Sequence, residues 1–175
     1  IDFFAINDLH GKFDDTDSQC GVDEMTTYFK DAKKENDHVV LLSSGDMWQG
    51  SSESNLTKGQ IVTEWMNDLD FVSMTLGNHE FDYRVPRLLE LVHDASLPVV
   101  NLNFRTIASD SLFFQPYIIK EYGNKRIAFL GVLTPETIIS EAYAFFNKDT
   151  QQMYTLCKDR LVELVQRYVD EVRHL

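Results

Sequence analysis

Four side chains in the first half of the chain could together hold a metal ion. Asp8 and His10 stand two residues apart, so an extended backbone points both to the same side and the pair can chelate. Asp46 and Asn78 each follow a glycine. Taken singly, each residue has an ordinary explanation as a turn residue, a helix cap or a surface histidine. Together they form a mixed oxygen and nitrogen set that suits manganese, zinc, iron or magnesium.

Whether these residues form one site depends on where they fall relative to the predicted strands. Four apolar runs alternate with segments whose apolar residues recur every three or four positions, which predicts β-α-β-α-β-α-β. The runs are Phe3 to Ile6, Val39 to Leu42, Phe71 to Leu76 and Pro98 to Leu102, and the helical segments are Val22 to Lys34, Gln60 to Leu69 and Pro86 to Leu91. Such alternation favours an α/β fold with parallel strands and flanking helices.

The candidate ligands follow the first three runs directly. In a parallel sheet the ligand site lies outside the carboxyl ends of the strands. We therefore expect Asp8, His10, Asp46 and Asn78 to converge at one edge of the sheet.

Two more elements are expected in the second half of the chain. Tyr117 to Tyr122 and Arg126 to Leu133 flank Gly123-Asn-Lys125, which is typical of a β-hairpin. The segment from about Gln151 to Leu175 has an apolar face and is predicted to be an amphipathic helix. Phe113 and Phe114 are expected to be core or domain-packing residues.

Composition limits the classes of function. At 175 residues and 43% hydrophobic content the chain is long enough for one domain with a real core. Its formal charge of −12 argues against binding a nucleic acid polymer, and an anionic substrate would require a recruited cation. The sequence has no run of eighteen apolar residues, the length that would indicate a membrane span. Cys20 and Cys157 show no Cys-x-x-Cys spacing and are expected to be ordinary thiols.

Three stretches, in order, resemble the first three motifs of the calcineurin-like metallophosphoesterases, specifically of the 5′-nucleotidase branch. They are NDLHGKF, SSGDMWQGS and TLGNHEFDY. The stretches LPVVNLNF and YIIKEYGNKRIAFLGVLTPET resemble the following strand and hairpin of that branch. The resemblance implies part of a four-layer α/β/β/α sandwich.

The resemblance also implies a role for each candidate residue. Asp8 and His10 would bind the first of two divalent metal ions, Asp46 would bridge both ions, and Asn78 would bind the second. His79 and Asp82 would be the catalytic pair, with His79 close to the scissile phosphate and Asp82 orienting its ring. We expect Glu80 to be a helix-start carboxylate or a neighbour of the ligands rather than a ligand itself.

The implied activity is hydrolysis of nucleotides or related phosphate esters by a dinuclear metal centre. Trp48-Gln-Gly-Ser51 stands where the protein-phosphatase branch carries an Asp-Arg pair, which favours a small-molecule substrate over a phosphoprotein. The same branch leaves open cyclic phosphodiesters, nucleotide-sugar pyrophosphates and thiosulfate esters as substrates. A non-catalytic metal-binding or structural module is a further alternative.

The extent of the resemblance predicts that residues 1–175 are the N-terminal portion of a catalytic domain. The family motifs that supply further metal histidines, and the C-terminal nucleotide-binding domain, are expected beyond Leu175. Among the residues that match the family motifs, three would bind the first ion and two would bind the second, with Asp46 counted in both sets. The chain alone is therefore expected to be inactive. By analogy with relatives, an extracytoplasmic location is favoured, and a cytoplasmic one is possible.

Overall fold

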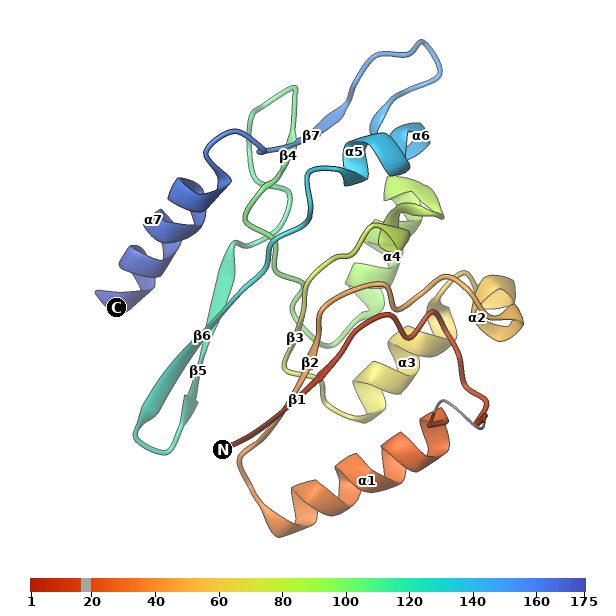
Figure 1. Cartoon of the computed structure of the whole chain (residues 1–175), viewed down its shortest axis with the longest axis vertical. Coiled ribbons are helices and arrows are strands. Elements are labelled where there is room, and N and C mark those ends of the chain that lie inside the picture. Colours follow the sequence, from red (N-terminus) through yellow and green to blue (C-terminus); the bar gives the residue numbers. More distant parts are fainter. Residues whose placement is uncertain (17–19) are drawn as a thin grey trace.

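The computed structural model describes residues 1–16 and 20–175, and a parallel sheet of three strands lies at its centre (Figure 1). The strands are β1 (Asp2–Ile6), β2 (Val39–Ser43) and β3 (Ser73–Met74), in the order β1-β2-β3. The middle strand is buried on both faces, with Val40 and Leu41 almost fully enclosed. This is the burial expected of a parallel sheet covered on both sides, and it confirms the predicted α/β class.

Helices cover one side of this sheet. They are α1 (Val22–Glu35), α3 (Gln60–Asp68) and α4 (Arg84–Asp94), and a short helix α2 (Ser52–Thr57) precedes α3. The ring of Phe4 in β1 packs against Phe29 of α1 at 5.5 Å between centroids. The indole Nε1 of Trp65 in α3 donates to Thr26 Oγ1 at 2.7 Å, which fixes α3 beside α1.

A β-hairpin and a helix form the other side of the molecule (Figure 1). The hairpin consists of β5 (Tyr117–Tyr122) and β6 (Lys125–Leu130), and α7 (Leu161–Arg173) lies against it. The backbone N–H of Leu102 donates to Gly131 O at 2.9 Å, which joins the hairpin end to the segment beside the parallel sheet. Tyr117 donates to Glu171 of α7 at 2.7 Å. Helices, sheet, hairpin and α7 thus follow one another as four layers.

The structure corrects three of the predicted elements. The third strand is shorter than the predicted Phe71 to Leu76, and Pro98 to Leu102 forms isolated parallel bridges at Val99 and Val100 instead of a strand. The predicted helix from Gln151 begins only at Leu161. The residues before it form β7 (Tyr154–Leu156), which pairs with β4 (Phe104–Thr106). Long-range pairing that buries Leu156 against Phe104 outweighs the local helical pattern here.

An aromatic cluster joins the remaining short elements: the 3₁₀ turn η1 (His79–Phe81), α5 (Thr137–Ser140) and α6 (Ala142–Phe145). Phe81 of η1, Phe104 of β4 and Phe145 of α6 are fully buried and contact one another at 5.0 to 5.7 Å between ring centroids. Phe113 and Phe114 pack partly buried against Phe104, as expected of core residues. The cluster therefore ties η1 to chain segments more than twenty residues away.

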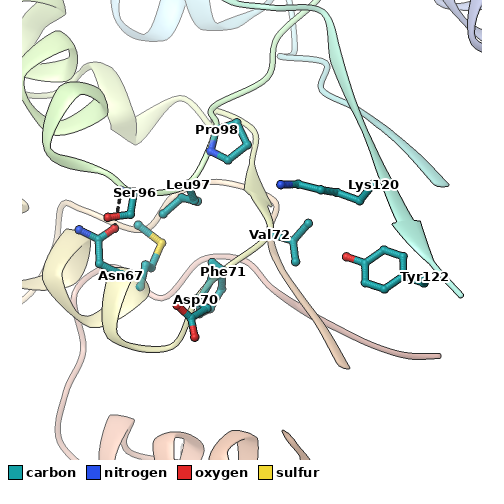
Figure 2. Close-up of a pocket in the computed structure, with 10 residues that line it drawn as sticks. Asn67, Asp70, Phe71, Val72, Ser96, Leu97, Pro98, Lys120 and Tyr122 are labelled. Carbon is teal, nitrogen blue, oxygen red and sulfur yellow. Dashed lines mark hydrogen bonds between the residues drawn. The ribbon is translucent and has the colours of Figure 1, made fainter. Parts of the chain in front are cut away.

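A cavity of about 290 Å³ lies at the edge of the sheet where β3 begins (Figure 2). Phe71 and Val72, which lead into β3, line it together with Pro98, Lys120 and Tyr122. The backbone N–H of Ser96 closes one side by donating to Asn67 Oδ1 at 2.7 Å. This is the amino end of the strands, opposite the edge to which the candidate ligands belong.

No helix in the described part of the chain has the length and apolar character needed to cross a membrane.

Candidate metal centre

Two loops that leave β1 and β2 run side by side at the carboxyl edge of the sheet. The backbone N–H of Asp8 donates to Gly45 O at 3.1 Å, and that of His10 donates to Asp46 O at 3.0 Å. The pairing between the strands is thereby continued into the loops. As a result, one ligand atom from each of Asp8, His10 and Asp46 lies within 4.8 Å of the others.

All three of these residues have left-handed backbone conformations. The φ angles are 54° at Asp8, 51° at His10 and 56° at Asp46. Positive φ is uncommon outside glycine, although Asp, Asn and His tolerate it best, and such residues gather at functional sites. The conformation turns each side chain out of its loop and toward the shared space.

Two glycines allow the loops to approach. A Cβ on Gly45 would lie 2.2 Å from the backbone N of Gly77, and a Cβ on Gly77 would lie 2.3 Å from Asp46 Oδ1. Both distances are far shorter than a real contact, so any larger residue would push the loops apart. The glycines before Asp46 and Asn78 are therefore needed for close packing of the site.

The imidazole of His10 is oriented by the backbone. Its Nδ1 lies 2.8 Å from Gln49 O, so Nδ1 carries the proton and donates to that carbonyl. The other nitrogen, Nε2, lies 3.7 Å from Asp8 Oδ1. An imidazole held through one nitrogen with the other facing carboxylates is the usual arrangement of a histidine metal ligand. The donor set thus fits a divalent cation.

Glu80 is buried, and its side chain joins the two loops. Its carboxylate accepts hydrogen bonds from the backbone N–H groups of Asp46 and Gly77, both at 2.7 Å, and of Met47 at 2.8 Å. Burial raises the pKa of Glu80 despite these three donors. Because both carboxylate oxygens are used to hold the two loops together, Glu80 is a support for the ligands, which agrees with the expectation from sequence.

His79, from the stretch TLGNHEFDY, lies at the same site. The backbone N–H of His79 donates to Asp46 Oδ1 at 2.8 Å, and the rings of His79 and His10 lie 5.0 Å apart. His79 Nδ1 is 3.0 Å from Oδ2 of Asp82, the residue that directly follows η1. The structure therefore brings His79 and Asp82 together as a pair beside Asp8, His10 and Asp46.

The surroundings of His79 favour its protonated form. Burial alone lowers the pKa of His79, but the hydrogen bond with Asp82 and the nearby carboxylates of Asp46 and Glu141 together raise it above its ordinary value. The side chain is 36% exposed, so a ligand can reach it. Such an imidazole can donate a hydrogen bond or a proton to an anion.

Two residues near the site were not predicted from sequence. Glu141 is buried, and its Oε1 lies 3.5 Å from Asn78 Nδ2. Tyr143 donates from its hydroxyl to Asp82 Oδ1 at 3.2 Å. Both come from the segment that begins α6, more than fifty residues after η1. The only signal in the sequence is the apolar pair Phe145-Phe146 that follows them, and it does not reveal which elements they meet.

Asn78 is oriented by this contact. Because Glu141 offers only acceptor atoms when ionised, the amide nitrogen of Asn78 must face it. The amide oxygen of Asn78 is then left for a different partner, as metal binding by Asn78 would require.

Known proteins resemble this chain in sequence and in fold. Residues 1–167 match the family model of the calcineurin-like phosphoesterases. Snake venom 5′-nucleotidase of Crotalus adamanteus is 34% identical in an alignment of 146 positions that covers 75% of this chain and 25% of that protein. Human 5′-nucleotidase is 31% identical in an alignment of 147 positions that covers 75% of this chain and 26% of that protein. The matched region thus spans about a quarter of the length of these relatives.

Solved structures show the same fold. The calcineurin-like phosphoesterase YfkN of Bacillus subtilis superposes with a TM-score of 0.82 at 20% identity, over 98% of this chain and 57% of that one. The NAD nucleotidase of Haemophilus influenzae superposes with a TM-score of 0.78 at 22% identity, over 98% of this chain and 32% of that one. With the family model matching nearly the whole chain, the protein belongs to the calcineurin-like phosphoesterase family.

Proposed function

We propose that this chain is the N-terminal portion of the catalytic domain of a metal-dependent phosphohydrolase that acts on nucleotides or related phosphate esters. The observation that carries the proposal is the convergence of Asp8, His10 and Asp46 beside His79 at the carboxyl edge of the sheet. The family and the curated 5′-nucleotidase relatives support it.

The metal ligands of the proposal are Asp8, His10, Asp46 and Asn78. Asp8, His10 and Asp46 would hold one divalent ion, and Asp46 would share a second ion with Asn78. The oxygen and nitrogen donors suit manganese, zinc, iron or magnesium. When bound, two such ions supply charge that stabilises a phosphoryl group and lowers the pKa of a bound water toward neutrality.

The remaining roles fall to His79 and Asp82. Asp82 accepts the Nδ1 proton of His79, so Nε2 of the same ring is the atom that can face a substrate. A protonated imidazole in that position can hydrogen-bond the phosphoryl oxygens or protonate a leaving alkoxide. Asp82 holds the ring in this orientation throughout.

We propose that the remaining metal ligands and the surface that recognises the nucleobase lie after Leu175, in a continuation of the chain. Counted in this chain, the proposed second ion has only Asp46 and Asn78. Further histidines from a continuation of the catalytic domain would complete it, and a separate C-terminal domain would select the nucleoside. Since one similar protein is a venom component, we further propose an extracytoplasmic location.

The test is phosphate release from AMP by a form of the protein that continues past Leu175, with added manganese. Metal-dependent turnover is expected, and it should disappear in Asp46→Asn. Bis(p-nitrophenyl) phosphate, a nucleotide sugar and a thiosulfate ester serve as competing substrates. Turnover of one of these in place of AMP would change the substrate class, and no metal-dependent turnover of any would refute the phosphohydrolase function.

A further inference from the structure

The carboxylate of Asp82 is held from two sides. Its Oδ2 receives the Nδ1 proton of His79 at 3.0 Å, and its Oδ1 receives the hydroxyl proton of Tyr143 at 3.2 Å. The Asp82 side chain is 17% exposed, so little water competes for these oxygens. Rotation of the carboxylate would break both bonds together, and the Tyr143 contact therefore opposes any rotation that releases the histidine.

Tyr143 is itself fixed in place from behind. Arg84 Nη1 donates to the Tyr143 carbonyl at 2.8 Å, and the Arg84 guanidinium carbon lies 5.4 Å from the Tyr143 ring centroid. Two residues later, Phe145 of α6 packs against Phe81 of η1 at 5.0 Å between ring centroids, and both rings are fully buried. Because Phe81 directly precedes Asp82, this packing sets the distance between Tyr143 and Asp82.

The phenol of Tyr143 is suited to act as a donor. Burial, together with the neighbouring carboxylates of Glu141 and Asp82, raises the pKa of Tyr143, so the hydroxyl keeps its proton. The residue as a whole remains 42% exposed. Its contact with Asp82 is therefore not a consequence of filling the core, and a phenylalanine at this position would fit without steric change.

We propose that Tyr143 is a positioning residue for the reaction: its hydroxyl fixes the Asp82 carboxylate, which in turn holds the His79 imidazole toward the substrate. This inference rests on the proposed function, since it assigns Tyr143 to the same site. Within the described part of the chain, Tyr143 has no hydrogen bond to Asp8, His10, Asp46 or Asn78. It acts through Asp82.

The experiment compares Tyr143→Phe with Tyr28→Phe in the form of the protein that continues past Leu175. Tyr28 is an exposed residue of α1, outside the proposed site, so its variant controls for loss of a hydroxyl group. Loss of a supporting hydrogen bond at a metal site typically reduces activity by about 10- to 100-fold. We expect Tyr143→Phe to lower kcat on AMP roughly 10-fold with KM and metal content unchanged, and Tyr28→Phe to match the wild type.

A double-mutant cycle separates positioning from a general structural effect. In an Asp82→Ala background no side-chain oxygen remains for the Tyr143 hydroxyl to fix, so Tyr143→Phe should have little further effect on kcat. An unchanged kcat in Tyr143→Phe alone, or the same fold-loss in both backgrounds, would overturn the proposal.

A spectrum of the imidazole groups gives a readout that needs no activity. In a ¹H–¹⁵N spectrum of the same protein, Tyr143→Phe should shift or broaden the His79 Nδ1–H signal, while Tyr28→Phe should leave it in place. If the wild type releases no phosphate, the proposed function fails, yet this spectrum still decides the positioning role. An unmoved His79 signal in Tyr143→Phe would reject that role.

Discussion

Left-handed backbone at Asp8, His10 and Asp46 is the residue-scale feature that makes the site possible. Each such residue costs about 1 to 2 kcal/mol relative to an ordinary conformation. Backbone hydrogen bonds between the two loops, such as the one from Asp8 N to Gly45 O, hold the residues in this conformation and offset its cost. A substitution that tests function should therefore keep the left-handed preference. Asparagine does so at position 46, and its Oδ1 can still accept from the His79 N–H.

At this scale we expect Asp46→Asn and His79→Asn to fail in different ways. Asp46→Asn removes a charged ligand, so bound metal and phosphate release should fall together. His79→Asn removes an acid and hydrogen-bond donor, so turnover should fall about 10² to 10⁴-fold while metal content stays unchanged. The measurements are metal analysis and phosphate release on the form that continues past Leu175. Equal loss of metal in both variants would mean that His79 is a ligand.

Glu80 gives a prediction about stability. Glu80→Ala would leave three buried or partly buried backbone N–H groups, those of Asp46, Met47 and Gly77, without their present acceptor. Each unsatisfied group costs about 1 to 3 kcal/mol, so the free energy of unfolding should fall by about 3 kcal/mol or more. Urea unfolding measures this change. Glu35→Gln, at an exposed position of α1, is the control and should stay near the wild type. A Glu80→Ala variant as stable as that control would show that these hydrogen bonds contribute little.

At the scale of elements, local patterns were sufficient where the chain is regular. The apolar runs and helical spacing predicted β1, β2, α1, α3 and the β5–β6 hairpin, and the structure confirms them. They failed where a distant partner decides the conformation. Tyr154 to Leu156 forms a strand because Phe104 to Thr106 lies opposite. The contact of Tyr143 with Asp82 depends on packing of Phe145 against Phe81, which no local spacing encodes. The same limit applies to the candidate site: sequence predicted that Asp8, His10 and Asp46 lie together, but it did not reveal residues such as Tyr143 that contact the site from a distant segment.

Two buried asparagines replace regular strand pairing after Pro98. Asn103 is fully buried; its Nδ2 donates to Leu133 O at 2.8 Å and its Oδ1 accepts from Leu133 N at 3.0 Å. Asn101 Oδ1 accepts from the backbone N–H groups of Asn103 and Phe104. Side-chain amides thus satisfy backbone groups that a continued ladder would otherwise pair.

Asn103→Leu should therefore destabilise the protein although leucine is apolar and similar in size. The backbone N–H and C=O of Leu133 would both lose their partner, at a cost of about 2 to 5 kcal/mol. Asn103→Asp keeps the acceptor for the N–H and replaces the donor with a second acceptor, so it should also be destabilising. Thermal unfolding of both variants beside the wild type is the measurement. Wild-type stability in Asn103→Leu would contradict the role given to this amide.

At the scale of the whole molecule, the charge and the proposed site are linked. A formal charge of −12 disfavours the approach of phosphate esters. Bound divalent cations would offset this repulsion and allow an anionic substrate to bind. Two groups of three donor side chains lie close together in the described residues, Asp8, His10 and Asp46 and the neighbouring His79, Asp82 and Glu141. For a second ion, the proposed ligands in this chain are Asn78 and the shared Asp46.

The last prediction concerns the 175-residue chain by itself. A site with two protein ligands is expected to be weakly occupied and easily stripped, whereas a three-ligand site resembles ordinary catalytic sites with an open position. We therefore expect the chain alone to retain at most one manganese ion after gel filtration and to release negligible phosphate from AMP. Extending it past Leu175 should restore the second ion and turnover together.

Metal analysis and the phosphate assay, run on both forms and on Asp46→Asn of each, test this. Robust turnover by the 175-residue chain that disappears in Asp46→Asn would contradict the expectation, and would mean that a second copy or another residue of the chain completes the centre. Glu141, which already contacts Asn78, would be the first residue to substitute in that case.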